Sequence, residues 1–139
     1  MNARTRQCAR LARVRSIQHT LAAASASRAT RQVEALEASS DKLASLRIGF
    51  GAEQGETSGS ALASLGEIAM RLDVAREGLR ASIAGARHKA KLCKEARMAA
   101  RRDQESAERL TEKAASEEAR KAEKQQAQRP FARRRGEVE

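Results

Sequence analysis

A seven-residue repeat of small and aliphatic side chains runs through the second half of the chain. The residues that occupy one heptad position in succession are Leu65, Leu72, Leu79, Ala86, Cys93, Ala100, Ala107 and Ala114. A heptad repeat sustained over this length is typical of a helix that packs along another helix. The repeat therefore predicts a long helix over residues 61–128, with Leu65, Leu72 and Leu79 in its seam.

A shorter periodic stretch covers residues 3–48. Its first apolar residues are spaced by three or four positions and share one helical stripe: Leu11, Val14, Ile17 and Leu21. The stripe resumes at Val33 and continues at heptad spacing through Leu36, Leu43 and Phe50. This spacing predicts a first helix that turns its apolar stripe toward the second, with Leu36 and Leu43 in the coiled-coil seam.

The two periodic stretches are separated by residues 49–60, which hold four of the eight glycines. Such a cluster breaks a helix, and Ser58 or Ser60 can cap the helix that follows. We therefore predict an all-α fold: a long two-helix antiparallel coiled-coil hairpin over residues 1–128, with a longer second helix. Residues 129–139, which include Pro130, are predicted to form a basic flexible tail.

Folding the chain at the middle of the glycine loop sets an expected register. It places Cys93 opposite about residue 15, and His19 beside His88. Cys8 and Cys93 would then be too far apart for a disulfide, so both are expected to stay reduced. The two histidines form either a pH-sensitive pair, half of a metal site, or a coincidence of register. No Cys, Asp or Glu is placed to complete a metal shell, so we expect no metal.

The composition excludes several classes of protein. The chain has no Trp or Tyr and two Phe, and most of its apolar content is alanine, which buries little area per residue. No stretch reaches the about 18 apolar residues of a membrane span, which predicts no transmembrane segment. There is no phosphate-binding loop and no spacing of nucleophile and base that two helices would gather into a pocket. We therefore expect no enzyme and no cofactor.

The formal net charge of +10 favours anionic partners such as nucleic acid, anionic lipid or an acidic protein surface. The first 33 residues carry seven Arg and no acid, a composition that an organellar transit peptide would also show. The helical periodicity continues past residue 33, so the cytoplasm is the expected location. No aromatic residue is interleaved among the basic ones for base stacking, and Glu34, Glu37 and Asp41 interrupt the positive charge. A solvated coiled-coil face is therefore favoured over a specific nucleic-acid site.

Large apolar residues concentrate around the glycine loop, whereas the other end of the hairpin has an alanine seam. Two helices share one seam, so some of the side chains near the loop should remain exposed. The residues expected to be exposed are Leu46, Ile48, Phe50 and Leu62. An exposed apolar patch is typical of a partner-binding surface. The alternative is that these side chains only close the turn.

This layout resembles the FliJ-like stalk proteins of bacterial flagellar type III export and their YscO-like relatives in injectisomes. The resemblance covers most of residues 4–128. It rests on the Arg-studded start (Arg10 to Arg15), the spacing of Leu36 and Leu43, the Leu65-Leu72-Leu79 repeat, and the charged stretch from Arg109 to Arg120. The acid-plus-Gln/Lys signature common near the end of the family's second helix is only approximated here, by Glu118 and the segment 121–125.

The resemblance implies a coupling stalk or escort protein rather than an enzyme. Its implied partners are a hexameric export ATPase ring, the membrane export gate and, in addition, export chaperones. The implied location is cytoplasmic and peripheral to the inner membrane, at the export apparatus of the bacterial flagellum. Two alternatives remain open from the sequence: a generic coiled-coil scaffold that dimerises through its heptads, and a basic nucleic-acid-binding hairpin.

Overall fold

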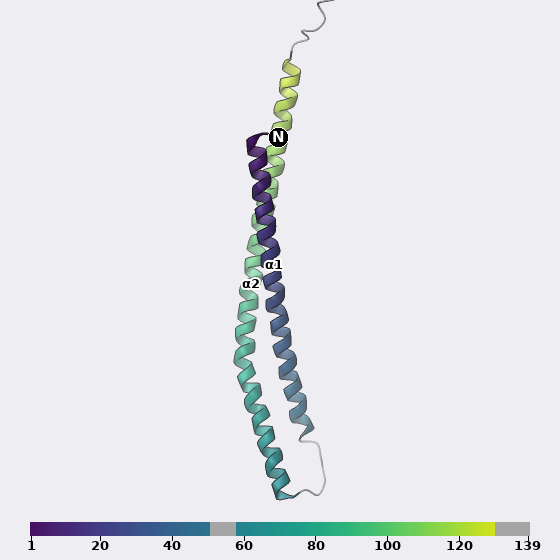
Figure 1. Cartoon of the computed structure of the whole chain (residues 1–139), viewed down its shortest axis with the longest axis vertical. Coiled ribbons are helices and arrows are strands. Elements are labelled where there is room, and N and C mark those ends of the chain that lie inside the picture. The colour runs from purple at the N-terminus through teal and green to yellow at the C-terminus, as the bar shows by residue number, and fades with distance from the viewer. Residues whose placement is uncertain (51–57, 130–139) are drawn as a thin grey trace, which may run out of the picture. The chain divides into compact units, whose positions relative to one another are not determined.

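The computed structural model describes residues 1–50 and 58–129 and consists of two long helices in that part of the chain (Figure 1). Helix α1 spans Ala3–Gly49 and helix α2 spans Gly59–Gln128. The described residues contain no strand, and the two helices make extensive contacts with each other. The predicted all-α two-helix hairpin with a longer second helix is thereby confirmed. The glycine-loop residues 51–57 and the tail residues 130–139 lie outside the described part.

Both helices begin at a polar cap. The Oδ1 atom of Asn2 accepts a hydrogen bond from the Thr5 backbone N–H at 2.9 Å, which satisfies a first-turn donor of α1. At the start of α2, the Ser58 hydroxyl accepts one from the Ala61 backbone N–H at 3.3 Å. The sequence prediction of a capping serine is confirmed at Ser58. Helix α1 ends at Gly49 and Phe50 lies in a turn, as the glycine cluster predicts.

The chain divides into two compact units. The terminal unit contains Met1–Leu21 and Met98–Glu139, of which residues up to 129 are described, and the loop unit contains Ala22–Arg97. In each unit a segment of α1 packs antiparallel against a segment of α2. The buried apolar residues are all alanines: Ala107 and Ala114 in the terminal unit, and Ala26, Ala29, Ala69 and Ala86 in the loop unit.

In α1, a buried or half-buried residue recurs at alternating steps of three and four. In the loop unit this seam contains Ala22, Ala26, Ala29, Val33, Leu36, Ser40, Leu43 and Arg47. In the terminal unit it contains Thr5, Cys8, Ala12, Arg15 and His19. The alternation of three and four residues is the heptad pattern of a coiled coil. The predicted seam leucines Leu36, Leu43, Leu65, Leu72 and Leu79 are all half-buried.

The expectation for the first apolar stripe of α1 is wrong. The side chains of Leu11, Val14, Ile17 and Leu21 are between 41% and 64% exposed instead of facing α2. The reason is a difference in helical phase. The heptad that contains Leu36 continues backward through small and polar side chains, and this phase points the four aliphatic side chains away from α2.

The expected register is also wrong. Arg15, expected opposite Cys93, forms an ion pair with Asp103 instead, with 3.3 Å between Nη1 and Oδ2. His19 and His88 belong to different units, and Arg87, the neighbour of His88, pairs with Glu37 at 2.6 Å. The observed cross-helix pairs are therefore displaced along α2 from the expected ones.

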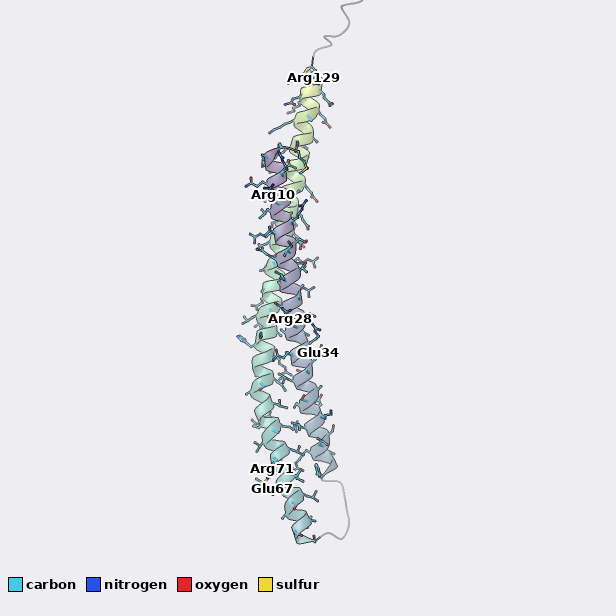
Figure 2. The ribbon with its side chains drawn as sticks, viewed as in Figure 1. Arg10, Arg28, Glu34, Glu67, Arg71 and Arg129 are labelled. Carbon is cyan, nitrogen blue, oxygen red and sulfur yellow. The ribbon has the colours of Figure 1, made fainter. Side chains whose placement is uncertain are left out.

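The offset arises because α2 begins well before it meets α1. Arg47, in the last turn of α1, pairs with Asp73 at 3.3 Å, so the first turns of α2 from Gly59 extend past the end of α1 (Figure 1). An ion pair between Glu67 and Arg71 at 2.7 Å, labelled in Figure 2, lies along this projecting segment. In this projecting segment Leu62 and Met70 are exposed, whereas Leu65 is half-buried and Ala69 is buried.

Candidate partner-binding site

A groove of about 420 Å³ lies at the loop end of the loop unit. Helix α1 and the turn after it supply most of its lining, and Leu65 is the contribution from α2. The α1 side consists of Lys42, Ser45, Leu46, Gly49 and Phe50. We refer to this set of residues as the loop-end groove. Its lining combines three large apolar side chains with the polar side chains of Lys42 and Ser45.

The groove follows from the local sequence of α1. Lys42, Ser45 or Leu46, and Gly49 recur at steps of three and four, which places them on one face of the last two turns. At Gly49 no heavy atom lies within 4 Å of the position that a Cβ would occupy, so the wall is open there. Leu65 closes the opposite side because the projecting segment of α2 runs past the end of α1.

The chemistry of the groove suits recognition of an apolar side chain. Leu46, Phe50 and Leu65 present aliphatic and aromatic surface, and Lys42 adds an ammonium group to the lining. An apolar side chain of a partner would bury surface on both sides of the contact, at about 25 cal/mol per Å². A carboxylate next to that side chain would be attracted by Lys42.

The structure brings only two of the four predicted partner-binding residues into the groove. Leu46 and Phe50 line it and are 49% and 39% exposed. Ile48 and Leu62 are also exposed but are not part of the lining. The sequence pattern does not assign Lys42, Ser45 or Gly49 to a partner surface, and it places Leu65 in the seam only.

A second hollow of about 220 Å³ also lies in the loop unit and is polar. Its lining contains two carboxylates, two guanidinium groups and the Ser40 hydroxyl, and Arg80 pairs with Glu77 at 3.4 Å. Opposite charges balance within it. This hollow therefore has no net charge with which to select an ionic ligand.

A polar cluster that the sequence analysis missed joins the two helices in the terminal unit. The buried Thr5 hydroxyl donates a hydrogen bond to Glu118 Oε2 at 2.6 Å, and the Asn2 backbone N–H donates one to Glu118 Oε1 at 2.9 Å. The Met1 amino group lies 3.2 Å from the same carboxylate, and Arg4 pairs with the adjacent Glu117 at 2.8 Å. The hydrogen bond from Thr5, followed by that from the amino group, lowers the pKa of Glu118 below its ordinary value of 4.5.

The cysteines and histidines do not gather into a site. Cys8 and Cys93 are free and half-buried, and they belong to different units. The Nε2 atom of His19 is buried without a hydrogen-bond partner among the described residues, while His88 is exposed. Residues 1–50 and 58–129 contain no group of three or more His, Cys, Asp or Glu side chains that would hold a metal ion. In the same ranges, neither helix is long and apolar enough to cross a membrane.

Comparison of the chain with protein-family models, with curated proteins and with solved structures finds no match in any of the three sets.

Proposed function

We propose that this chain is a non-enzymatic coiled-coil protein that acts by binding partner proteins, and that the loop-end groove is one of its contact sites. The observation that carries this proposal is the exposure of Leu46 and Phe50 in a concave apolar surface formed by both helices. Large apolar side chains that line a groove and stay exposed among the described residues are typical of a recognition surface rather than a packed core.

The more specific form of the proposal is a coupling stalk or escort protein of flagellar type III export. Its support is the resemblance in layout to the FliJ-like proteins, together with a hairpin whose buried contacts are alanines. Helices joined by small side chains approach each other closely, which suits a narrow shaft. The proposed partners are the hexameric export ATPase, the membrane export gate and export chaperones, at a cytoplasmic site peripheral to the inner membrane.

The export proposal is tested with purified proteins from one bacterial source. The chain is sedimented with the export ATPase, and separately with the cytoplasmic part of the export gate, at about 150 mM salt, where exposed charge pairs are mostly screened. Co-sedimentation with either partner, together with raised ATPase activity in the first mixture, is the expected result. Failure to associate with both would overturn the export form of the proposal.

A matched pair of variants tests the groove itself. Phe50→Ser removes an apolar side chain from the groove lining, whereas Ile48→Ser removes one that is more exposed but not in the lining. We expect Phe50→Ser to weaken the complex at least about tenfold, which corresponds to about 1.4 kcal/mol, and Ile48→Ser to leave it unchanged. Equal effects of the two substitutions would show that the groove is not the contact site.

The scaffold alternative is supported by aliphatic side chains that are exposed on the outer faces of α2, among them Met70, Val74, Leu92 and Met98. A dimerising scaffold would bury such residues between two copies. Analytical ultracentrifugation of the chain alone distinguishes the two functions. A monomer mass supports the stalk, whereas a stable dimer that persists at low micromolar concentration supports the scaffold.

A further inference from the structure

Four exposed aliphatic side chains of the terminal unit lie on one face of α1. Leu11, Val14, Ile17 and Leu21 are spaced by three or four residues, so one of them occurs on each successive turn. Each is more than 40% exposed. Spacing of one aliphatic residue per turn is what a neighbouring helix contacts in a coiled coil. Within the terminal unit, α2 packs on the other side of α1, along Thr5, Cys8 and Ala12.

The register of the terminal unit extends this face onto α2. Arg4 and Glu117 form an ion pair at 2.8 Å. One heptad further along each antiparallel helix lie Leu11 and Leu110, which is 49% exposed.

One more heptad leads to Gln18 and Asp103, and both accept hydrogen bonds from Arg15 Nη1, at 3.1 and 3.3 Å. The contacts on either side therefore place Leu11 and Leu110 at matching positions along the same edge of the helix pair. We refer to Leu11, Val14, Ile17, Leu21 and Leu110 as the terminal apolar face.

Positive charge borders this face. Arg10 and Arg13 are four residues before Val14 and Ile17, and Arg6 is four residues before Arg10, so the three guanidinium groups run beside the aliphatic stripe. All three are exposed, and none forms an ion pair within the described residues, whereas Arg4 and Arg15 are paired with α2 (Figure 2, where Arg10 is labelled). There is no acidic residue in the first 33 positions to neutralise them.

We propose that the terminal apolar face is the docking site for an acidic amphipathic helix of another protein, which lies along α1 as a third helix. Its aliphatic residues would pack on Val14, Ile17 and Leu21, and its Asp or Glu residues would pair with Arg6, Arg10 and Arg13. Guanidinium groups bind carboxylates through two parallel hydrogen bonds, which fixes the orientation of the partner as well as attracting it. The proposal goes beyond the function proposed above and uses a different surface of the chain.

Charge and side-chain type favour an acidic helix over two other occupants, a second copy of this chain and a lipid surface. A second copy related by a two-fold axis would bring Arg10 and Arg13 against the same cationic face, which is repulsive. Helices that lie in a lipid surface use aromatic and aliphatic side chains over a broad face. Residues 1–21 and 98–129 contain no aromatic side chain except the imidazole of His19, which lies in the seam.

The test uses two synthetic helical peptides with the same aliphatic stripe, one flanked by Glu and one by Lys, titrated into the full chain at about 150 mM salt. We expect the Glu peptide to bind and the Lys peptide not to bind. Val14→Ser/Ile17→Ser should weaken the Glu peptide at least about tenfold. Arg10→Glu/Arg13→Glu should reverse the preference and favour the Lys peptide. Val74→Ser, an exposed aliphatic change in the loop unit, is the matched control and should have no effect.

Circular dichroism confirms that each variant keeps its helix content, which is expected because all the substituted side chains are exposed. Absence of binding by the Glu peptide up to about 100 µM would overturn the proposal, as would binding that none of the substitutions changes. Co-sedimentation with phosphatidylserine vesicles that depends on Val14 and Ile17, without peptide binding, would also overturn it and assign the face to a membrane surface. None of these results depends on the loop-end groove, so the two proposals fail separately.

Discussion

The Thr5 hydroxyl and the Glu118 carboxylate form a 2.6 Å hydrogen bond between the first turn of α1 and α2. Thr5 is the buried polar residue of the described chain, and its backbone N–H is bound by the Asn2 cap. One residue thus serves both the start of the helix and the pairing of the two helices. This contact joins the two helices of the terminal unit at a position where the seam residues are small or polar rather than large and apolar.

Thr5→Val should loosen the terminal unit. Valine keeps the shape of threonine but has no hydroxyl, so Glu118 loses its shortest hydrogen bond while the packing is retained. We expect faster amide hydrogen exchange in residues 3–10 and 114–121 than in the natural chain, with no change in the loop unit. Thr30→Val is the control, since the Thr30 hydroxyl bonds only to a carbonyl of its own helix. Equal exchange in both variants would show that the cross-helix bond does not hold the unit.

The lowered pKa of Glu118 predicts a pH dependence of stability. A carboxyl whose pKa is lower in the folded state stabilises the fold above its unfolded value of 4.5, and this contribution is lost as the pH falls through the folded pKa. Glu118→Gln should therefore unfold at a lower temperature than the natural chain at neutral pH. The difference in melting temperature should shrink when both are measured well below pH 4.5. A difference that does not vary with pH would contradict this account.

The alanine seam predicts intolerance of larger residues. Ala107 is 2% exposed, and a leucine at this position would force α1 and α2 apart. We expect Ala107→Leu to reduce the free energy of unfolding by about 1–3 kcal/mol, measured by urea denaturation. Ala99→Leu is the matched control on the exposed side of the same helix and should change stability by no more than about 0.5 kcal/mol.

The glycines within α2 predict a stabilising substitution. No heavy atom lies within 4 Å of the Cβ position at Gly78, and the residue is inside the helix. Gly78→Ala should raise the free energy of unfolding by about 0.5–1 kcal/mol, because alanine loses less backbone freedom on folding. Ala84→Gly, at an exposed position two turns later, should lower it by a similar amount. Thermal melts of the two variants should therefore shift in opposite directions.

The ion pair between Arg87 and Glu37 predicts a measurable coupling in the loop unit. Both side chains are partly exposed, so the expected coupling free energy is modest, about 0.2–1 kcal/mol. A double-mutant cycle with Arg87→Ala and Glu37→Ala measures it, and the coupling should decrease as salt is raised. Zero coupling at low salt would mean that this pair does not help to set the register.

The helices and the phase of the second seam could be predicted from the sequence because Leu65, Leu72 and Leu79 repeat at one heptad position. The register could not. A heptad repeat is satisfied equally well when one helix is moved by a whole heptad, and the expected register differs from that of Arg4 and Glu117 by roughly two heptads. The cross-helix ion pairs distinguish the alternatives, and these become visible only once the helices are placed.

The loop-end groove and the terminal apolar face could likewise be predicted only in part from the sequence. Leu46 and Phe50 were predictable as exposed because too many large side chains gather near the loop for one seam. The other residues that line the groove could not be predicted, because the lining depends on how far α2 projects beyond the end of α1. On the other surface, the prediction that large aliphatic residues face inward failed at Leu11 and Val14, where small and polar side chains continue the heptad instead.

The buried alanines on the α2 side of the terminal unit also bear on the axial position of the two helices. Leucine knobs lock two helices at one axial position, but Ala107 and Ala114 protrude so little that a shift by one heptad recreates nearly the same apolar contacts. Such a shift would change which polar groups meet, for example whether Thr5 reaches Glu118 and whether Arg15 reaches Asp103. The axial position of this pair is thus set by hydrogen bonds and by salt-sensitive ion pairs more than by hydrophobic packing.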